Sequence, residues 1–125
     1  MLNIFAIFTG GGIGAVLRYL TSVYLVKNIH QNLPFATFLV NIVGSFVIGF
    51  LYVYFLDKQD LNPAVKYALT VGFCGGLTTF STFSLELFDM IKNADFVHAF
   101  IYVVVSVIIC VLAVTIGASI AKFCI

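Results

Sequence analysis

The chain has 125 residues, of which 62% are hydrophobic and only 9% are charged, and its mean hydropathy is +1.17. A soluble domain needs about 25% charged residues to cover its surface, so a water-soluble globular protein is excluded and lipid is expected as the outer solvent. The net charge of +1 gives no electrostatic case for binding nucleic acid or a strongly anionic membrane surface.

Four apolar stretches are each long enough to cross a bilayer, because about 20 helical residues span a hydrocarbon core of about 30 Å. The predicted helices cover about residues 2–24, 35–56, 63–91 and 96–123, with short polar loops between them. We predict an all-α membrane protein with a single transmembrane domain, 1–125, whose successive helices are antiparallel neighbours. The first stretch has no basic region and no small-residue cleavage site, so we interpret it as a retained span rather than a signal peptide.

Small residues recur at four-residue spacing in the first two predicted helices. Gly10 and Gly14 lie on the first helix, and Ser45 and Gly49 lie on the second. Such pairs let helix backbones approach closely in lipid. We predict that they serve helix packing.

Each of the same two helices carries one conspicuous polar side chain within its apolar stretch. Arg18 lies in the last third of the first span, where it either snorkels to the interface or pairs structurally, with attraction of anions to a vestibule as the functional alternative. Asn41 needs a hydrogen bond inside the second span. Its amide NH₂ can donate to an anion while its oxygen accepts from a neighbouring helix, and an interhelical bond without a ligand is the alternative.

The third predicted helix contains the most informative segment, residues 72–84, with the sequence Gly-Phe-Cys-Gly-Gly-Leu-Thr-Thr-Phe-Ser-Thr-Phe-Ser. Each glycine of the pair at 75–76 costs a helix about 1 kcal/mol against alanine, and two threonines follow at 78–79. We therefore predict a break in mid-membrane. The freed carbonyls suit a hard cation, and the amide groups near Thr79 and Phe80 suit an anion.

The residues after the predicted break suggest how an anion is held. Phe80 and Phe83 are spaced to share one helix face, and their electropositive ring edges, with nearby hydroxyls, suit a partly dehydrated anion. Ordinary packing is the alternative for such a stripe. Glu86 and Asp89 lie near the end of this span, where either caps a vestibule or pairs with a basic residue, and a transported proton site is the third reading.

The fourth predicted helix carries a thin polar stripe, because Tyr102, Ser106 and Cys110 are spaced by four residues. The stripe either guides an ion or hydrogen-bonds backbone carbonyls. The chain's other cysteines are Cys74 and Cys124, and none forms a C-x-x-C pair, so we interpret all three as small hydrophobic residues.

The basic residues are evenly divided between the two expected sides of the membrane. One side holds Lys58, Lys66 and Lys122, and the other holds Arg18, Lys27 and Lys92. This balance leaves almost no positive-inside bias, which favours insertion in both orientations and pairing of opposite copies. The alternative is that a weaker cue fixes one orientation.

Over its whole length the chain resembles the bacterial CrcB/Fluc fluoride channels. The resemblance is carried by Gly-Gly-Gly-Ile-Gly at 10–14 with Arg18-Tyr19, by Asn-Ile-Val-Gly-Ser at 41–45, and above all by the long segment 72–84. It implies an antiparallel dual-topology homodimer with two pores, in which broken third helices cross at the two-fold axis. It also implies a structural Na⁺ at that axis, held by the backbone carbonyls of Gly75 and Thr78 from both subunits and not transported.

The same resemblance assigns pore roles to individual residues. Phe80 and Phe83 correspond to the pore phenylalanines and Asn41 to the pore asparagine, while the hydroxyls of Thr79 and Ser81 lie beside the anion path. Cys110 stands where a hydroxyl is often expected, so the fourth-helix track is the loosest part of the match.

The implied function is passive export of fluoride across the inner or plasma membrane, which confers fluoride resistance. We find no phosphate-cradling loop and no nucleophile–base pair, so we expect neither a nucleotide ligand nor an enzyme. The main alternative is a small proton-coupled exporter of the four-helix multidrug type, which needs a carboxylate near the middle of a span. A purely structural subunit without transport is the second.

Overall fold

Every regular element is a helix in the computed structural model, which describes residues 1–28, 34–58 and 60–125. The elements are α1 (Leu2–Asn28), α2 (Phe35–Asp57), α3 (Pro63–Tyr67), η1 (Ala68–Cys74), α4 (Gly75–Leu77), α5 (Phe80–Lys92) and α6 (Phe96–Cys124). They form four segments long and apolar enough to cross a membrane, the third running from α3 to α5. The predicted all-α, four-span architecture is confirmed, although residues 29–33 and 59 of the predicted loops lie outside the described part.

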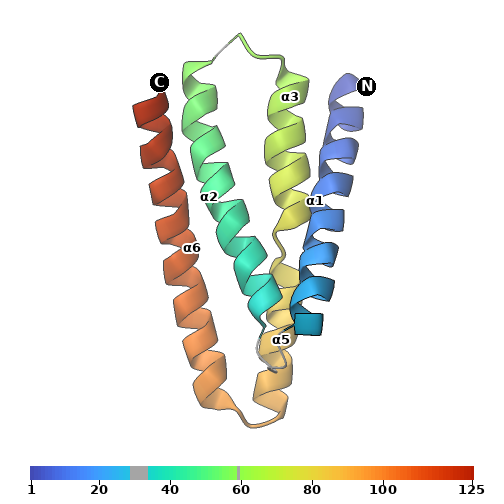
Figure 1. Cartoon of the computed structure of the whole chain (residues 1–125), viewed down its shortest axis with the longest axis vertical. Coiled ribbons are helices and arrows are strands. Elements are labelled where there is room, and N and C mark those ends of the chain that lie inside the picture. Colours follow the sequence, from blue (N-terminus) through green and yellow to red (C-terminus); the bar gives the residue numbers. More distant parts are fainter. Residues whose placement is uncertain (29–33, 59) are drawn as a thin grey trace.

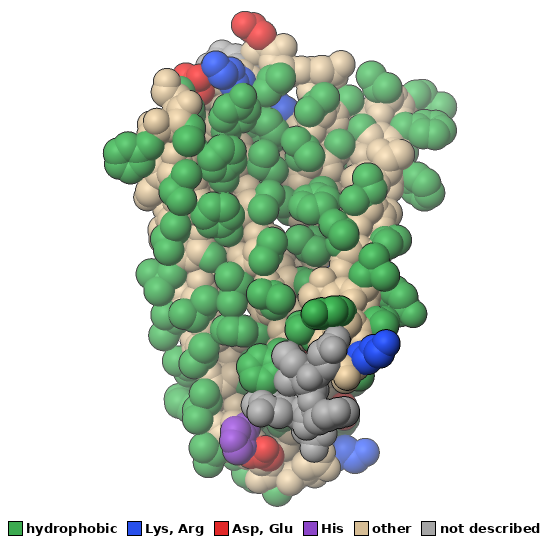
Figure 2. Space-filling model, in the orientation of Figure 1, with side chains coloured by type: hydrophobic (Ala, Val, Ile, Leu, Met, Phe, Trp, Pro, Cys, Tyr) green, Lys and Arg blue, Asp and Glu red, His purple; other side chains and the backbone are tan. Residues whose placement is uncertain are grey.

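Successive spans run in opposite directions along the bundle, as expected from the short loops. Figure 1 shows both termini and the α2–α3 connection at one end, and the α5–α6 connection at the other. In Figure 2, charged side chains gather at these two ends while hydrophobic side chains cover the surface between them. Large exposed residues such as Phe8, Phe100 and Ile116 belong to this apolar surface, which suits contact with lipid.

The closest packing joins alternate spans rather than successive ones. The first span, α1, lies mainly against η1 and α4, and α2 lies mainly against α6. Successive spans are antiparallel and in contact, as predicted, but they pack less closely than the alternate spans do. Glycines explain the difference, because they are concentrated where the alternate spans meet.

Gly10, Gly14 and Gly49 mark these close approaches. A Cβ atom at Gly10 would overlap the carbonyl oxygen of Ala68, one at Gly14 would overlap that of Phe73, and one at Gly49 would overlap that of Val114. The packing role predicted for these three glycines is confirmed.

We expect Gly14→Ala to lower the free energy of unfolding by about 1–3 kcal/mol, the usual cost of overpacking. The added methyl group would meet the backbone of Phe73 and Leu77, which cannot move without displacing α4. The measurement is thermal unfolding of the purified protein in detergent. Gly12→Ala is the matched control, since a Cβ there meets nothing within 4 Å and alanine favours the helix. Equal melting temperatures for the two variants would contradict this account.

The third span departs from regular α-helix at two places. Its middle part, η1, is a π-helix, which the sequence analysis did not predict. The pair Gly75-Gly76 remains helical, within α4, and the chain becomes extended only at Thr78 (φ −78°, ψ 155°) and Thr79 (φ −151°, ψ 117°). Helix α5 then starts at Phe80. The interruption therefore falls on the threonines that follow the glycines.

Candidate functional site

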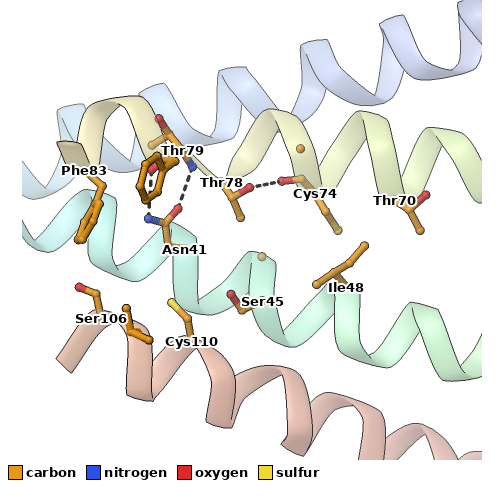
Figure 3. Close-up of a pocket in the computed structure, with 14 residues that line it drawn as sticks. Asn41, Ser45, Ile48, Thr70, Cys74, Thr78, Thr79, Phe83, Ser106 and Cys110 are labelled. Carbon is orange, nitrogen blue, oxygen red and sulfur yellow. Dashed lines mark hydrogen bonds between the residues drawn. The ribbon is translucent and has the colours of Figure 1, made fainter. Parts of the chain in front are cut away.

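A cavity of about 480 Å³ lies beside this extended segment, between α2, the third span and α6 (Figure 3). It is lined by Asn41, Gly44, Ser45, Ile48, Thr70, Cys74, Gly75, Thr78, Thr79, Phe80, Phe83, Ser106, Val107 and Cys110. No lining side chain carries a charge, so the cavity offers amide, hydroxyl and thiol groups within apolar walls.

Asn41 holds the extended segment through two hydrogen bonds. Its Nδ2 donates to the carbonyl oxygen of Thr79 at 3.2 Å, and its Oδ1 accepts from the Thr79 amide at 2.8 Å (Figure 3). In a continuous helix the Thr79 amide would donate to the carbonyl of Gly75, so the Asn41 oxygen replaces the helical acceptor that the interruption removes. One N–H of the Asn41 amide is left after these bonds. The predicted interhelical bond is present, and donation to an anion stays a prediction.

Thr79 caps the N-terminus of α5. Its Oγ1 accepts from the Thr82 amide at 3.2 Å, donates to the Thr82 hydroxyl at 3.0 Å, and lies 3.2 Å from the Ser81 hydroxyl. The first amides of α5 have no helical acceptors, and the start of a helix carries partial positive charge. This end of α5 adjoins the cavity, because both Thr79 and Phe80 line it. Ser81 is exposed and does not line the cavity.

The two phenylalanines are placed differently. Phe83 is buried, with its ring centroid 4.9 Å from that of Tyr102 and 5.6 Å from that of Phe80. Phe80 also lines the cavity but is 78% exposed in the single chain. Ordinary packing accounts for much of the Phe83 environment, whereas Phe80 has no such role within this chain.

The predicted polar stripe on α6 divides into two parts. Ser106 lines the cavity, is only 8% exposed, and its Oγ has no hydrogen-bond partner among the described residues. A buried hydroxyl without a partner costs about 1–3 kcal/mol, so this oxygen indicates a ligand or water in the cavity. Cys110, one turn further along, also lines the cavity, whereas Tyr102 does not. The Ser106 hydroxyl therefore does not donate to a backbone carbonyl, which was the structural alternative for this stripe.

Tyr102 instead belongs to a cluster around Glu86. The Tyr102 hydroxyl donates to Glu86 Oε2 at 2.8 Å, and the hydroxyl of Thr37 donates to Oε1 at 2.6 Å. Glu86 is thus held by hydroxyls and has no basic partner in the described part of the chain. It also lines a second hollow of about 450 Å³, together with Asp89, near the α5–α6 end. Of the readings left open by the sequence, a vestibule role suits this location, and pairing of Glu86 with a basic residue is not observed among the described residues.

Thr37 and Ser45 are polar residues that the functional reading of the sequence missed. Thr37 contacts Glu86, and Ser45 lines the cavity. Both are spaced by four residues from Asn41, so the three share one face of α2. Extending the search by one turn on each side of Asn41 would have found them.

Arg18 turns toward the interrupted span rather than toward a membrane interface. Its Nη1 donates to the carbonyl oxygen of Thr78 at 3.3 Å, and the residue is half-buried. Of the readings left open by the sequence, structural pairing is the one observed. Arg18 does not line the cavity, although Gly75 and Thr78, the predicted cation ligands, do.

Comparison with known proteins gives one consistent result. The sequence model of a family described as "CrcB-like protein, Camphor Resistance (CrcB)" matches residues 5–118. A Hydrogenobaculum protein named fluoride-specific ion channel FluC is 42% identical over 116 residues, which are 93% of this chain and 94% of the relative. Proteins with the same name from Flavobacterium psychrophilum and Nitratiruptor are 40% and 45% identical, over 98% and 85% of this chain and 98% and 81% of their own lengths.

Proposed function

This chain belongs to the CrcB-like protein family, and we propose that it is a fluoride-specific ion channel that exports fluoride passively. It is a multi-pass membrane protein, and the proposed export role places it in the inner or plasma membrane of the cell. Its relatives named as fluoride channels match it over nearly their whole lengths. The uncharged cavity beside the extended segment, with a few hydrogen-bond donors in apolar walls, supports the same function.

The cavity offers what a dehydrating fluoride ion needs. Ser106 contributes an unpartnered hydroxyl, Asn41 has a remaining N–H, and the start of α5 supplies amides with partial positive charge. Phe80 and Phe83 add ring edges that carry partial positive charge. A phenylalanine ring has no group that accepts a proton, so it does not react with hydrogen fluoride. Fluoride is small and strongly hydrated, so closely spaced donors replace its water shell, whereas the larger chloride ion fits them poorly.

The driving force is the membrane potential. Hydrogen fluoride enters cells as a neutral weak acid and dissociates inside, which traps the anion. A potential of 100 mV is worth about 2.3 kcal/mol for one charge, enough to expel the ion through an anion-selective pore without nucleotide hydrolysis or a coupled cation.

The working unit is an antiparallel homodimer with two pores. The balanced distribution of lysine and arginine supports insertion in both orientations. Phe80 and Gly75 are both exposed in the single chain although they line the cavity, and a second copy laid against this face would cover them.

The carbonyls of Gly75 and Thr78 fit a structural Na⁺ in kind and number. The amide of Thr79 is taken by Asn41, so the Gly75 oxygen lacks its usual helical donor, and the Thr78 oxygen receives only one N–H, from Arg18. Two such oxygens from each copy make a four-oxygen shell. The bound cation would supply positive charge that joins the two interrupted spans.

Release of fluoride from liposomes containing the purified protein tests this function. With equal pH on both sides and a K⁺ gradient opened by valinomycin, we expect fluoride efflux at least about a hundredfold faster than chloride efflux, a difference of about 2.7 kcal/mol. Comparable chloride and fluoride efflux would overturn the proposal. Flux that requires a proton gradient and is lost in Glu86→Gln would identify the exporter instead, and absence of any flux would favour a structural subunit.

A further inference from the structure

Arg18 places a full positive charge on the carbonyl end of the interrupted span. Its guanidinium donates to the Thr78 oxygen, and no ion pair in the described residues includes it. The last carbonyls of a helix carry partial negative charge, so the guanidinium neutralises the end of α4. Arg18, a side chain of the same subunit, therefore already supplies part of the positive charge that a bound cation would bring to these carbonyls.

The position of Arg18 is fixed by its own helix. Gly14 lies one turn before Arg18, and its contacts with the backbone of Phe73 and Leu77 clamp α1 against η1 and α4. The base of the Arg18 side chain therefore cannot move away from the interrupted span without separating the two helices. The packing of α1 thus holds Arg18 close to Thr78, and the hydrogen bond between them does not depend on a mobile surface side chain.

We propose that Arg18 is a built-in competitor of the interfacial sodium ion, so that it sets the sodium affinity of the dimer. This inference rests on the sodium site proposed above. A guanidinium and a metal ion on the same Thr78 oxygen repel each other, and the hydrogen bond occupies one of that oxygen's two lone pairs. Arg18 weakens sodium binding, and in return it keeps the carbonyl end of α4 satisfied when sodium is scarce.

Thermal unfolding of the purified dimer in detergent, titrated with NaCl against N-methylglucamine chloride at constant ionic strength, tests this role. For Arg18→Gln we expect a lower melting temperature without sodium and a half-saturating sodium concentration at least about tenfold below that of the wild type. Arg18→Lys keeps the unit positive charge and should stay within about threefold of the wild type. Lys27→Gln is the matched control, because it removes the same charge from an exposed site on the same helix.

An unchanged or higher half-saturating concentration in Arg18→Gln would overturn the role of Arg18 while leaving the sodium site intact. If neither the wild type nor Arg18→Gln responds to sodium, the sodium site and this inference both fail. Fluoride efflux measured on the same preparation shows separately whether the channel proposal stands. If Arg18→Gln does not fold at any sodium concentration, Arg18→Lys decides, since a tenfold shift with the charge retained contradicts a competition based on charge.

Discussion

Phe80→Ile is expected to abolish fluoride-selective efflux while leaving the fold and the dimer intact. Phe80 lines the cavity, and the substitution keeps an apolar side chain there but removes the aromatic ring and its electropositive edge. Phe80 is 78% exposed in the single chain, so its packing within the subunit contributes little. We expect the fluoride efflux rate from liposomes to fall at least about a hundredfold, which corresponds to about 2.7 kcal/mol at the barrier.

Phe88→Ile is the control for this experiment. Phe88 lies two turns further along α5, is 60% exposed and does not line the cavity, so the same substitution there should leave efflux unchanged. Phe83→Ile should also abolish efflux, although its buried ring adds a cost in stability that Phe80 does not carry. Normal fluoride selectivity in Phe80→Ile, with the dimer retained on size exclusion, would show that the ring edges do not contact the ion.

The spans were predictable because crossing a bilayer demands a long apolar stretch, a property of composition over about 20 residues. The predicted ends at about 24 and 91 differ from the observed ends at Asn28 and Lys92 by only a few residues. Which helices pack against each other was harder to predict from the sequence. Gly10 and Gly14 indicated that α1 packs closely against something, but the partner was found only in the structure.

Several polar residues of the site could be singled out from the sequence, but the bonds among them could not. Asn41, Ser106 and Glu86 stood out because polar groups are costly inside a span. Their partners depend on where the third span becomes extended. The sequence predicted a break at the glycine pair and the two threonines that follow it, and only the structure shows that Gly75-Gly76 stays helical while Thr78 and Thr79 become extended. Once that segment is placed, Asn41 is seen to bind backbone, and Glu86 is seen to bind hydroxyls instead of a basic side chain.

Asn41→Asp is expected to stop fluoride permeation more completely than removal of the side chain by Asn41→Ala. The aspartate oxygen that replaces Nδ2 would face the Thr79 carbonyl oxygen, so one bond of the clamp becomes a repulsion. The new negative charge would also repel an anion in the cavity, by about 4 kcal/mol for charges 4 Å apart at an effective dielectric constant of about 20. We therefore expect the efflux rate to fall about a thousandfold, against a loss of about tenfold to a hundredfold for Asn41→Ala.

Asn3→Asp isolates the effect of position, because it makes the same chemical change at an exposed site in the first turn of α1, which lines neither the cavity nor the second hollow. It should leave fluoride efflux within about twofold of the wild type, since a solvated charge at this distance is largely screened. Asn41→Ala and Asn41→Asp then separate two functions of one side chain. Equal losses would mean that Asn41 acts only by holding Thr79, because the added charge would have had no ion to repel. A larger loss for the aspartate, at a melting temperature no lower than that of Asn41→Ala, indicates that the anion passes close to the amide, because the added repulsion against the Thr79 carbonyl would itself lower stability.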